Sequence, residues 1–443
     1  MPTDLSVHSD QADLSPLPMA LAARAACRAA GYVEPNPLVG CTLVSPLDPS
    51  RPLPVADRII AVAHHERYGG PHAEALAIAR ARSLGRSTAG ATAYVTLEPC
   101  NSTGRNPPCV DALLAAGISR VVIARADPSP AKGNGAERLR TAGVGVIWAD
   151  HPSSPAYNLK ATRLADTFIK RTLTGTPWVI AKWAQTLDGK VATRLGQSQW
   201  ISCERSRLRV HRLRARVDAI ITGVGTVLAD DPTLNARNVP VRRAALRVVV
   251  DPDASLVESS GLLRSRRVFA HTDRTPTALV IRANADISPH ALAPKLAAQG
   301  VTLLCISEDP QVPGRIDLRH LLRVLAAPSA DPDAEFPALR PANLSTSGAA
   351  TRPPVANVLL EAGPGLLGSF LAGDLVDECQ VYVAPTIMGD QEAPSAFDAG
   401  ATPTLDAIRT FEHFDTRHIG RDLRLTYRLP RRDPSHADVP SLP

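Results

Sequence analysis

Short apolar runs alternate with helix-like segments along the first third of the chain. The apolar runs are rich in β-branched residues and are short enough for buried strands; they occupy residues 38–44, 58–63, 92–97, 120–124 and 144–148. Helices are predicted over residues 16–31, 73–84, 108–116 and 135–142, the first with Ser15 as its cap and Gly31 as its stop. This order of elements predicts an α/β sandwich over residues 16–150.

The same mixture of strands and helices returns in the second part of the chain. Strands are predicted at 178–184, 218–222, 246–250, 278–281 and 301–305, a helix at 203–215, and a strand–turn–helix–strand unit from 355 to 385. The pattern therefore predicts a second α/β domain over residues 177–430. Residues 151–176, which contain several prolines, are expected to link the domains, and residues 1–15 and 431–443 are expected to be flexible tails. Residues 326–354, rich in Pro, Ala and Ser, are interpreted as a disordered insertion.

Composition agrees with a globular protein of more than one domain. The chain has 443 residues, of which 44% are hydrophobic and 21% charged. The net charge of +6 comes from scattered basic residues, with no run flanked by stacking aromatics, so we do not expect nucleic-acid binding. No apolar stretch approaches the roughly 20 residues that a membrane span needs, and the polar N-terminus is unlike a signal peptide. Seven cysteines, an odd number, favour a reducing cytoplasm over a disulfide framework.

One His and two Cys residues form a candidate zinc site. His72, Ala73 and Glu74 form a His-Ala-Glu triplet at the start of a predicted helix. Cys100 and Cys109 each follow a proline. A catalytic zinc needs three protein ligands and an open position for water, and His72, Cys100 and Cys109 supply three. Glu74 lies two residues from the His and can move protons without binding the metal. This arrangement is typical of zinc hydrolytic deaminases.

The spacing of the two cysteines leaves an alternative open. The common motif is Cys-x-x-Cys, whereas eight residues separate Cys100 from Cys109. Two cysteines at such a distance are often unrelated buried thiols. The His-Ala-Glu triplet and the Thr-Leu-Glu-Pro-Cys segment ending at Cys100 favour the metal site.

Both halves of the chain carry long motifs in a fixed order. The first half carries Asn-Pro-x-Val-Gly at 36–40, His-Ala-Glu at 72–74, Thr-Leu-Glu-Pro-Cys at 96–100 and Gly-Arg-x-Pro-Pro-Cys at 104–109. The second half carries Lys182, Leu-Asp-Gly at 187–189, Ser-Gln-Trp-Ile at 198–201, Thr-Val-Leu-Ala-Asp-Asp-Pro at 226–232 and Glu-Ala-Gly-Pro at 361–364. With these motifs the chain resembles a known family, the bifunctional deaminase/reductases of riboflavin biosynthesis, and the long spacing between the cysteines is also that of the family.

The resemblance implies two successive reactions. The first is hydrolytic deamination of a diamino-hydroxy-ribosylaminopyrimidine 5′-phosphate with Zn²⁺, and the second is reduction of the ribosyl group to ribityl with NADPH. It implies a cytidine-deaminase-like three-layer α/β/α domain followed by a dihydrofolate-reductase-like α/β domain. The partner is then a small pyrimidine ribosyl phosphate, and a homo-oligomer is expected, with a dimer favoured.

The resemblance also assigns residues to the deaminase pocket. Glu74 would be the proton shuttle, and Asn36 and His65 match substrate positions, although Asn36 could only shape a turn and His65 could be a surface residue at a strand end. Ser102 occupies a position where the family usually has a substrate-binding His. A serine donates one hydrogen bond but carries no charge near neutral pH, so we expect a weakened or altered deaminase.

A glycine-rich turn is the main candidate for cofactor binding in the second half. Gly363, Gly365 and Gly368 form a Gly-x-Gly-x-x-Gly pattern between a predicted strand and a predicted helix, where backbone N–H groups can meet a phosphate. The pattern alone is weak evidence, because the acidic residue expected about 20 positions later is missing, and a tight turn is the alternative. The resemblance extends the cofactor contact over Gly363, Pro364, Gly365, Leu366, Leu367 and Gly368.

The remaining matches to the family divide into substrate and cofactor positions. Arg214 and Arg237 could bind the substrate phosphate through paired hydrogen bonds. The other substrate positions are Lys182, Ser198, Leu234 and Glu361, and the other cofactor positions are Gln185, Trp200, Thr226 and Asp230. Each has a purely structural alternative, such as a helix cap for Ser198, a core residue for Leu234 or a solvent-facing side chain for Lys182.

Two other functions stay open at this point. The chain could be a reductase whose deaminase half is impaired or serves as a scaffold, which the Ser102 replacement would suit. A nucleic-acid-editing deaminase would need a basic or aromatic channel near residues 65–110, and the sequence has none.

Overall fold

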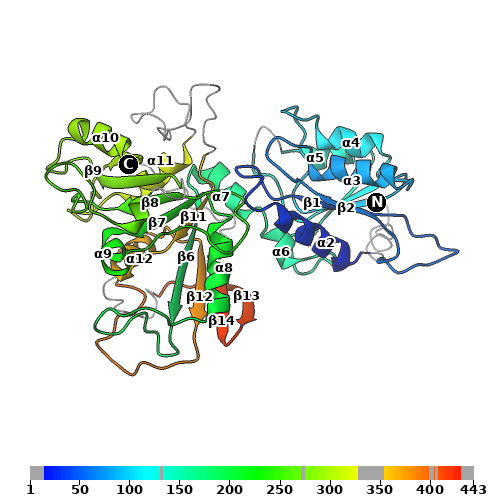
Figure 1. Cartoon of the computed structure of the whole chain (residues 1–443). Helices are drawn as coiled ribbons and strands as arrows, with labels where there is room; N and C mark the ends of the chain where they lie inside the picture. Colours follow the sequence, from blue (N-terminus) through cyan, green and yellow to red (C-terminus); the bar gives the residue numbers. More distant parts are fainter. Residues whose placement is uncertain are drawn as a thin grey trace. The chain divides into compact units, whose positions relative to one another are not determined.

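The computed structural model describes residues 14–129, 133–270, 275–327, 354–398, 404 and 408–430. The chain divides into two compact units, Met1–Gly175 and Thr176–Pro443 (Figure 1). Each unit contains its own sheet and its own buried core, so each is described by itself.

The first unit is built on a five-stranded sheet with the order β2-β1-β3-β4-β5. Its strands are β1 (Gly40–Val44), β2 (Ile59–His64), β3 (Thr92–Val95), β4 (Arg120–Ile123) and β5 (Gly145–Trp148). β1 pairs antiparallel with β2 and β3, whereas β3, β4 and β5 are parallel. The helical segments are α2 (Pro16–Ala26), η1 (Cys27–Ala29), α3 (Ala73–Ser83), α4 (Cys109–Ala115), α5 (Gly135–Thr141), α6 (Leu159–Thr162) and α7 (Asp166–Thr174).

Helices cover both faces of this sheet and give three layers. α3, α4 and α5 bury Ala77, Leu113 and Leu139 against one face. α2 buries Met19 on the other face, together with Tyr94 of β3. Neighbouring residues of a strand point to opposite faces, so the strands are buried on both sides, as their continuous apolar runs predict. The predicted α/β/α class of this unit is confirmed.

Two local features place α2 on the sheet. The Ser15 hydroxyl accepts a hydrogen bond from the Leu17 N–H at 3.2 Å, and Pro16 occupies the first helical position. Across the interface, a Cβ atom on Gly40 would lie 2.0 Å from the carbonyl oxygen of Ala22. Only glycine permits this close approach of helix and strand.

The segment expected to be a linker, residues 151–176, belongs to the first unit up to Gly175. The segment forms α6 and α7, and their buried residues hold it in the first unit. Ala161 packs with α2, and Ile169 packs against Leu97. Because these apolar side chains find partners on the first sheet, the segment folds onto that sheet instead of forming a free bridge.

The second unit contains a nine-stranded sheet with the order β10-β9-β8-β7-β11-β6-β12-β14-β13. Its strands are β6 (Trp178–Gln185), β7 (Ala219–Gly223), β8 (Leu246–Val250), β9 (Thr277–Arg282), β10 (Val301–Ile306), β11 (Asn357–Leu360), β12 (Glu378–Val383), β13 (Glu412–Ile419) and β14 (Asp422–Arg428). β6 to β12 run parallel to their neighbours, and β13 and β14 form an antiparallel hairpin beside β12.

Helices again pack on both faces of the second sheet. Its helical segments are α8 (Glu204–Arg214), α9 (Val224–Asp230), η2 (Arg267–Phe269), α10 (Pro289–Ala298), α11 (Leu318–Ala326) and α12 (Pro364–Ala372). Leu322 of α11 and Phe370 of α12 lie in one core cluster, whereas Val227 of α9 and Leu296 of α10 lie in another. The chain order β11–α12–β12 places the glycine-rich turn at the carboxyl end of a central strand, the usual site for ligands in such sheets.

The sequence analysis missed part of this unit. It did not predict α9, α10, α11 or the hairpin of β13 and β14. β13 is mostly exposed and polar, so it lacks the apolar signal on which the other predictions rest. The proposed insertion falls largely outside the described residues: Ala326 ends α11, and residues 328–353 are not described.

Candidate active sites

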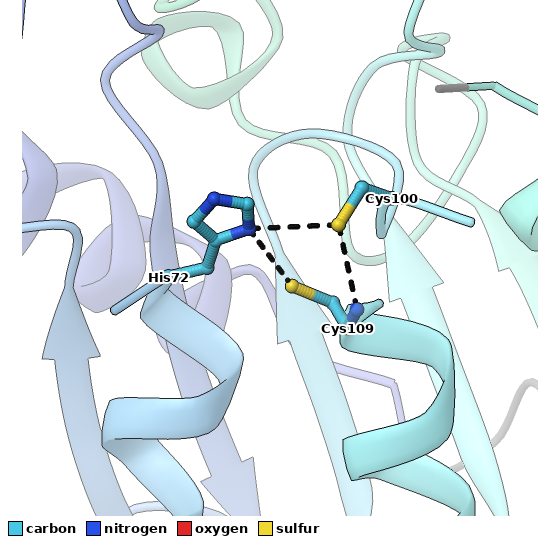
Figure 2. Close-up of side chains that lie close together, drawn as sticks. All are labelled: His72, Cys100 and Cys109. Atoms are coloured by element: carbon cyan, nitrogen blue, oxygen red, sulfur yellow. Dashed lines mark hydrogen bonds between the residues drawn. The ribbon is translucent and has the colours of Figure 1, made fainter. Parts of the chain in front are cut away.

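The three predicted zinc ligands converge in the first unit. His72 caps α3, Cys100 lies in the loop after β3, and Cys109 is the first residue of α4. Their ligand atoms all lie within 4.8 Å of one another. The His72 Nδ1 atom is 3.1 Å from the Cys109 sulfur and 3.5 Å from the Cys100 sulfur (Figure 2). One imidazole nitrogen and two sulfurs at such distances form a donor set that suits Zn²⁺.

The two thiols already differ in acidity. A hydrogen bond from Cys109, opposed by burial and aided by His72, lowers the pKa of Cys100 to about 4. The same pairing with Cys100, together with burial, raises the pKa of Cys109. The Cys109 N–H at the start of α4 also points at the Cys100 sulfur, 3.4 Å away. A thiolate is therefore stabilised at this position, and thiolates are the form that binds zinc.

Glu74 lies in the first turn of α3, beside this donor set. Its side chain is only 3% exposed, and its Oε2 atom has no hydrogen-bond partner among the described residues. Burial raises the pKa of the Glu74 carboxyl. A buried carboxylate oxygen without a partner is costly, so this atom fits a site completed by a water or a substrate amine. The residues present thus fit a zinc centre with a proton-transfer group.

Asn36 and His65 lie together at the same site. The Asn36 side-chain amide is 3.2 Å from His65 Nε2, and His65 Nδ1 is 2.9 Å from the Pro71 carbonyl oxygen. The carbonyl can only accept, so Nδ1 donates and Nε2 accepts from Asn36. The His65 ring is 3% exposed and stands edge-on to the His72 ring, 5.5 Å away. His65 is therefore buried and is not a surface residue.

The loop between the two cysteines carries Ser102. The Asn106 side-chain amide donates to the Gly70 carbonyl oxygen at 2.9 Å and ties this loop to the segment before α3. The guanidinium of Arg105 lies 4.9 Å from the centre of the Tyr68 ring. Ser102 itself is half-buried in the loop. The loop is thus fastened beside His72 with Ser102 between the two candidate ligands.

A cavity of about 1740 Å³ opens in the second unit. Its walls come from the carboxyl-end half of β6, from α8 and α9, from the segment around 232–238 and from the glycine-rich turn. Predicted site residues in the wall are Lys182, Ser198, Trp200, Arg214, Thr226, Asp230, Leu234, Arg237, Glu361, Gly363, Pro364, Gly365, Leu366 and Leu367. Gln185 and Gly368 are not among the lining residues.

An ion-pair network lines this cavity. Arg214 donates from Nε to Glu361 Oε1 at 2.6 Å and from its terminal nitrogen to Oε2 at 2.9 Å, and Lys182 Nζ lies 3.6 Å from Oε2. Burial alone would raise the pKa of Glu361, but the charges of Arg214 and Lys182 outweigh it and bring the pKa to about 2. Burial lowers the pKa of Lys182. The Lys182 side chain is thus neither solvent-facing nor free.

The two arginines expected at the substrate phosphate have different surroundings. The edge of the Arg214 guanidinium formed by Nε and one terminal nitrogen is engaged by Glu361, and the other terminal nitrogen donates to the Asn235 carbonyl oxygen at 3.1 Å. Arg237 donates to the Thr233 hydroxyl at 2.8 Å. Among the described residues, Arg237 therefore bonds only neutral groups, and it keeps more freedom than Arg214 to bind an anion.

The glycine-rich turn is fixed to α9. The N–H of Gly363 donates to the Thr226 hydroxyl at 2.9 Å, and a Cβ atom on Gly363 would meet that hydroxyl at 3.4 Å. Pro364 opens α12, and the following residues face the cavity. Gly368 is buried within the helix, where it serves packing. The turn presents the N-terminus of α12, a helix of nine residues, to the cavity, and this geometry is suited to binding a phosphate.

The other predicted positions divide between cavity wall and core. The Ser198 hydroxyl donates to Asp230 at 3.2 Å, which joins two predicted residues. Trp200 is 61% exposed, with the Arg207 guanidinium 4.4 Å from its ring centre. Leu234 is 3% exposed and belongs to a core cluster, as its structural alternative expects, although it also lines the cavity. Gln185 accepts from the Trp183 indole at 2.6 Å.

The sequence analysis overlooked His211. It lies on α8 one turn before Arg214, lines the cavity, and its Nδ1 atom is buried without a hydrogen-bond partner among the described residues. Burial, then Arg214 and Arg237, lower the pKa of His211 to about 4. The three-residue spacing from Arg214 on a helix places both side chains on one face, a signal that was present in the sequence.

No helix in the described part of the chain is both long enough and apolar enough to span a membrane.

Comparison with known families matches each unit separately. Residues 17–125 match the zinc-binding region of cytidine and deoxycytidylate deaminases. Residues 177–331 and 349–425 match the RibD C-terminal domain. The first match contains the candidate zinc site, and the second contains the cavity with its glycine-rich turn.

Full-length relatives cover both units. The riboflavin biosynthesis protein RibD of Aquifex aeolicus is 32% identical over 411 residues, covering 93% of this chain and 97% of the relative. That of Escherichia coli is 33% identical over 423 residues, covering 92% and 97%. A solved Thermotoga maritima diaminohydroxyphosphoribosylaminopyrimidine deaminase/5-amino-6-(5-phosphoribosylamino)uracil reductase is 28% identical with a TM-score of 0.68, covering 94% and 98%. Acinetobacter baumannii RibD reaches 30% and 0.67, covering 94% and 99%.

Proposed function

Because this chain belongs to the RibD family of bifunctional riboflavin-biosynthesis deaminase/reductases, we propose that its two units catalyse consecutive steps of that pathway. The first step removes an amino group from the diaminohydroxyphosphoribosylaminopyrimidine, and the second reduces the resulting 5-amino-6-(5-phosphoribosylamino)uracil. The observation that carries the proposal is the convergence of His72, Cys100 and Cys109 within 4.8 Å, beside a buried Glu74. The cofactors are zinc and NADPH.

In the deaminase unit, His72, Cys100 and Cys109 hold the zinc ion and Glu74 moves protons. Zinc, when bound, brings the pKa of a water ligand close to neutrality. Glu74 Oε2, which has no hydrogen-bond partner among the described residues, accepts one proton of the attacking water. The same carboxyl then gives this proton to the amino nitrogen, which leaves as ammonia. The ring carbon keeps the water oxygen, and the second proton of the water ends on the adjacent ring nitrogen, which gives the carbonyl form. Burial raises the pKa of Glu74, which brings it closer to that of a group able both to take and to return a proton.

Asn36 and His65 position the pyrimidine in this proposal. Their mutual hydrogen bond and the Pro71 carbonyl fix the His65 ring beside His72. Burial lowers the pKa of His65, so the ring stays neutral and binds through hydrogen bonds. Ser102, in the loop between the cysteines, is the further polar contact that we assign to the substrate.

In the reductase unit, the cavity holds substrate and cofactor side by side. NADPH supplies the hydride that reduces the sugar carbon at C1′. Glu361, held by Arg214 at 2.6 Å and by Lys182 at 3.6 Å, accepts hydrogen bonds from ribose hydroxyls, and Lys182 lies beside that carboxylate as a second cation. Arg237 binds the 5′-phosphate. The Gly363 turn and Thr226 place the cofactor phosphates at the start of α12.

The cellular compartment and the oligomeric state of the enzyme are also proposals. Seven free cysteines, two of them placed as metal ligands, support a reducing compartment, the cytoplasm. We keep the expectation of a homo-oligomer, with a dimer favoured, and sedimentation equilibrium of the purified chain tests it.

A second candidate function is a reductase with an impaired deaminase unit. The observation that favours it is Ser102, half-buried in the loop between the candidate ligands. Losing a polar substrate contact costs about 1–3 kcal/mol, which slows the reaction without preventing zinc binding. Zinc bound at one equivalent with no ammonia released would favour this function.

Substitution of Glu74 tests the deaminase assignment. Glu74→Gln removes the proton acceptor and leaves the three metal ligands, so it should keep zinc and abolish detectable ammonia release. Reduction of 5-amino-6-(5-phosphoribosylamino)uracil should continue at the wild-type rate. Ammonia release by the variant would contradict the role of Glu74, and loss of reduction would contradict two independent sites.

A further inference from the structure

Two arginines line the cavity of the second unit on elements that the proposed mechanism does not use. Arg315 lies in the loop between β10 and α11, and Arg319 lies in the first turn of α11. One Arg315 terminal nitrogen donates to the Ser369 hydroxyl at 3.0 Å, and Arg319 donates to the Gly373 carbonyl oxygen. Both bonds fasten the arginines to α12, the helix that begins at the glycine-rich turn.

The carboxylates of three acids in the same region, Asp309, Asp317 and Glu308, are bonded to groups other than these two arginines. Asp309 accepts from the Gln311 N–H at 2.8 Å, and Asp317 accepts from the His320 N–H at 3.0 Å. Glu308 accepts from the Asn284 side-chain amide at 2.7 Å and lies near Arg282. Within the described residues, neither Arg315 nor Arg319 forms an ion pair with a carboxylate. Two cations with only neutral partners therefore face the cavity.

The residues to which the two arginines bond lie further along α12 than the glycine-rich turn. Ser369 follows Gly363 by six residues, which corresponds to about 9 Å along a helix. The lining of the cavity also includes the apolar residues Val250, Pro252 and Leu366. A ligand with one phosphate at the turn could thus lay a flat base on this wall and carry a second phosphate to Arg315.

We propose that Arg315 binds the 2′-phosphate on the adenosine ribose of NADPH, with Arg319 as a supporting cation, and so makes the second unit prefer NADPH to NADH. The planar guanidinium matches a phosphate through two parallel hydrogen bonds, and the bond to Ser369 orients it beforehand. NADH has a hydroxyl at this position and would gain little from the same cation. This inference rests on the proposed reductase function.

Isothermal titration of the full chain with NADP⁺ and with NAD⁺ tests the proposal without turnover. Arg315→Ala should weaken NADP⁺ binding by about tenfold or more and leave NAD⁺ binding within twofold. Arg315→Lys keeps the charge but loses the paired hydrogen-bond geometry. Its affinity for NADP⁺ should therefore fall between those of the wild type and Arg315→Ala. Arg323→Ala is the matched control, because Arg323 is exposed on α11 and does not line the cavity.

Each other outcome has a distinct meaning. Unchanged NADP⁺ binding by Arg315→Ala would overturn the proposal, and so would equal weakening of NADP⁺ and NAD⁺. Unchanged NADP⁺ binding with a raised KM for the pyrimidine substrate would instead assign Arg315 to the substrate 5′-phosphate. If the wild-type chain bound neither nucleotide, the reductase function itself would fail. If it bound NADP⁺ and Arg315→Ala bound it equally well, only this inference would fail.

Discussion

At the scale of single residues, each site contains a buried carboxyl group, and the surroundings of the two groups shift their pKa values in opposite directions. Among the described residues, one oxygen of Glu74 has no hydrogen-bond partner, and burial raises the pKa of its carboxyl. Glu361 is held by Arg214 and Lys182, which bring its pKa to about 2 despite its burial. A carboxyl of the first kind takes up a proton more readily than an exposed one, whereas one of the second kind stays charged and binds. This difference in surroundings supports the proposal that Glu74 transfers protons and that Glu361 positions a ligand.

The pH dependence of stability offers a prediction for His211. Its pKa in the folded chain is about 4, and an unfolded histidine titrates near 6.5. Between these values the unfolded state binds more protons, so the free energy of unfolding decreases as the pH falls from about 6.5 to 4. His211→Gln removes this contribution, and its stability should decrease less over that range.

Urea unfolding at several pH values between 4 and 7 measures this difference. His290→Gln is the control, because His290 is exposed on α10 of the same unit. The control should follow the wild-type pH profile. A His211→Gln profile parallel to that of the wild type would show that His211 titrates normally in the folded chain.

Local and distant groupings of residues differ in how far the sequence predicts them. The zinc ligands were predicted because the His-Ala-Glu triplet and both Pro-Cys pairs are local motifs, and the structure brings them together. The bidentate pairing of Arg214 with Glu361 was not predicted, since those residues are 147 positions apart and their pairing depends on the order of strands in the sheet. The sequence analysis identified both residues as candidates for the site, but it did not predict that they contact each other.

At the scale of elements, the loop that carries Cys100 depends on the start of α5. A Cβ atom on Gly135 would lie 1.9 Å from the Pro99 carbonyl oxygen, and Pro99 directly precedes Cys100. The next N–H, of Ala136, donates to the buried Glu98 at 2.9 Å. Helix α5 is therefore locked against the segment that presents a zinc ligand, although it contributes no ligand itself.

Gly135→Ala tests this coupling. The added methyl group must push α5 away from the Cys100 loop, which should cost about 1–3 kcal/mol of stability and lower the zinc content below one equivalent. Gly145→Ala is the control, because a Cβ atom there meets its neighbours at an ordinary 3.6 Å. Metal analysis after gel filtration gives the answer. Full zinc occupancy in Gly135→Ala would show that the loop is held independently of α5.

Element prediction succeeded for strands with apolar sequences and failed for the polar hairpin of β13 and β14. β1, β3, β4, β7 and β8 are almost wholly buried, and all were predicted. β13 is a largely exposed edge strand with a polar sequence and was missed. The buried leucines of α11 recur at helical spacing, so that helix had a usable signal in the sequence. Exposed edge strands, by contrast, take their form from pairing with a neighbour.

At the scale of the whole molecule, two chemistries occupy separate compact units. The zinc ligands lie within Met1–Gly175, and the entire cavity lies within Thr176–Pro443. The net charge of +6 suits a protein whose substrates and cofactor are phosphorylated anions. We therefore expect the deaminated product of the first unit to be the substrate of the second.

Product identification tests this central claim most directly. The purified zinc-loaded chain is given the diaminohydroxyphosphoribosylaminopyrimidine, with and without NADPH, and the products are identified by mass spectrometry. Without NADPH we expect 5-amino-6-(5-phosphoribosylamino)uracil and one equivalent of ammonia. With NADPH we expect the ribityl product and one equivalent of oxidised cofactor. Unchanged substrate in the first reaction, or an unreduced deaminated product in the second, would contradict the account.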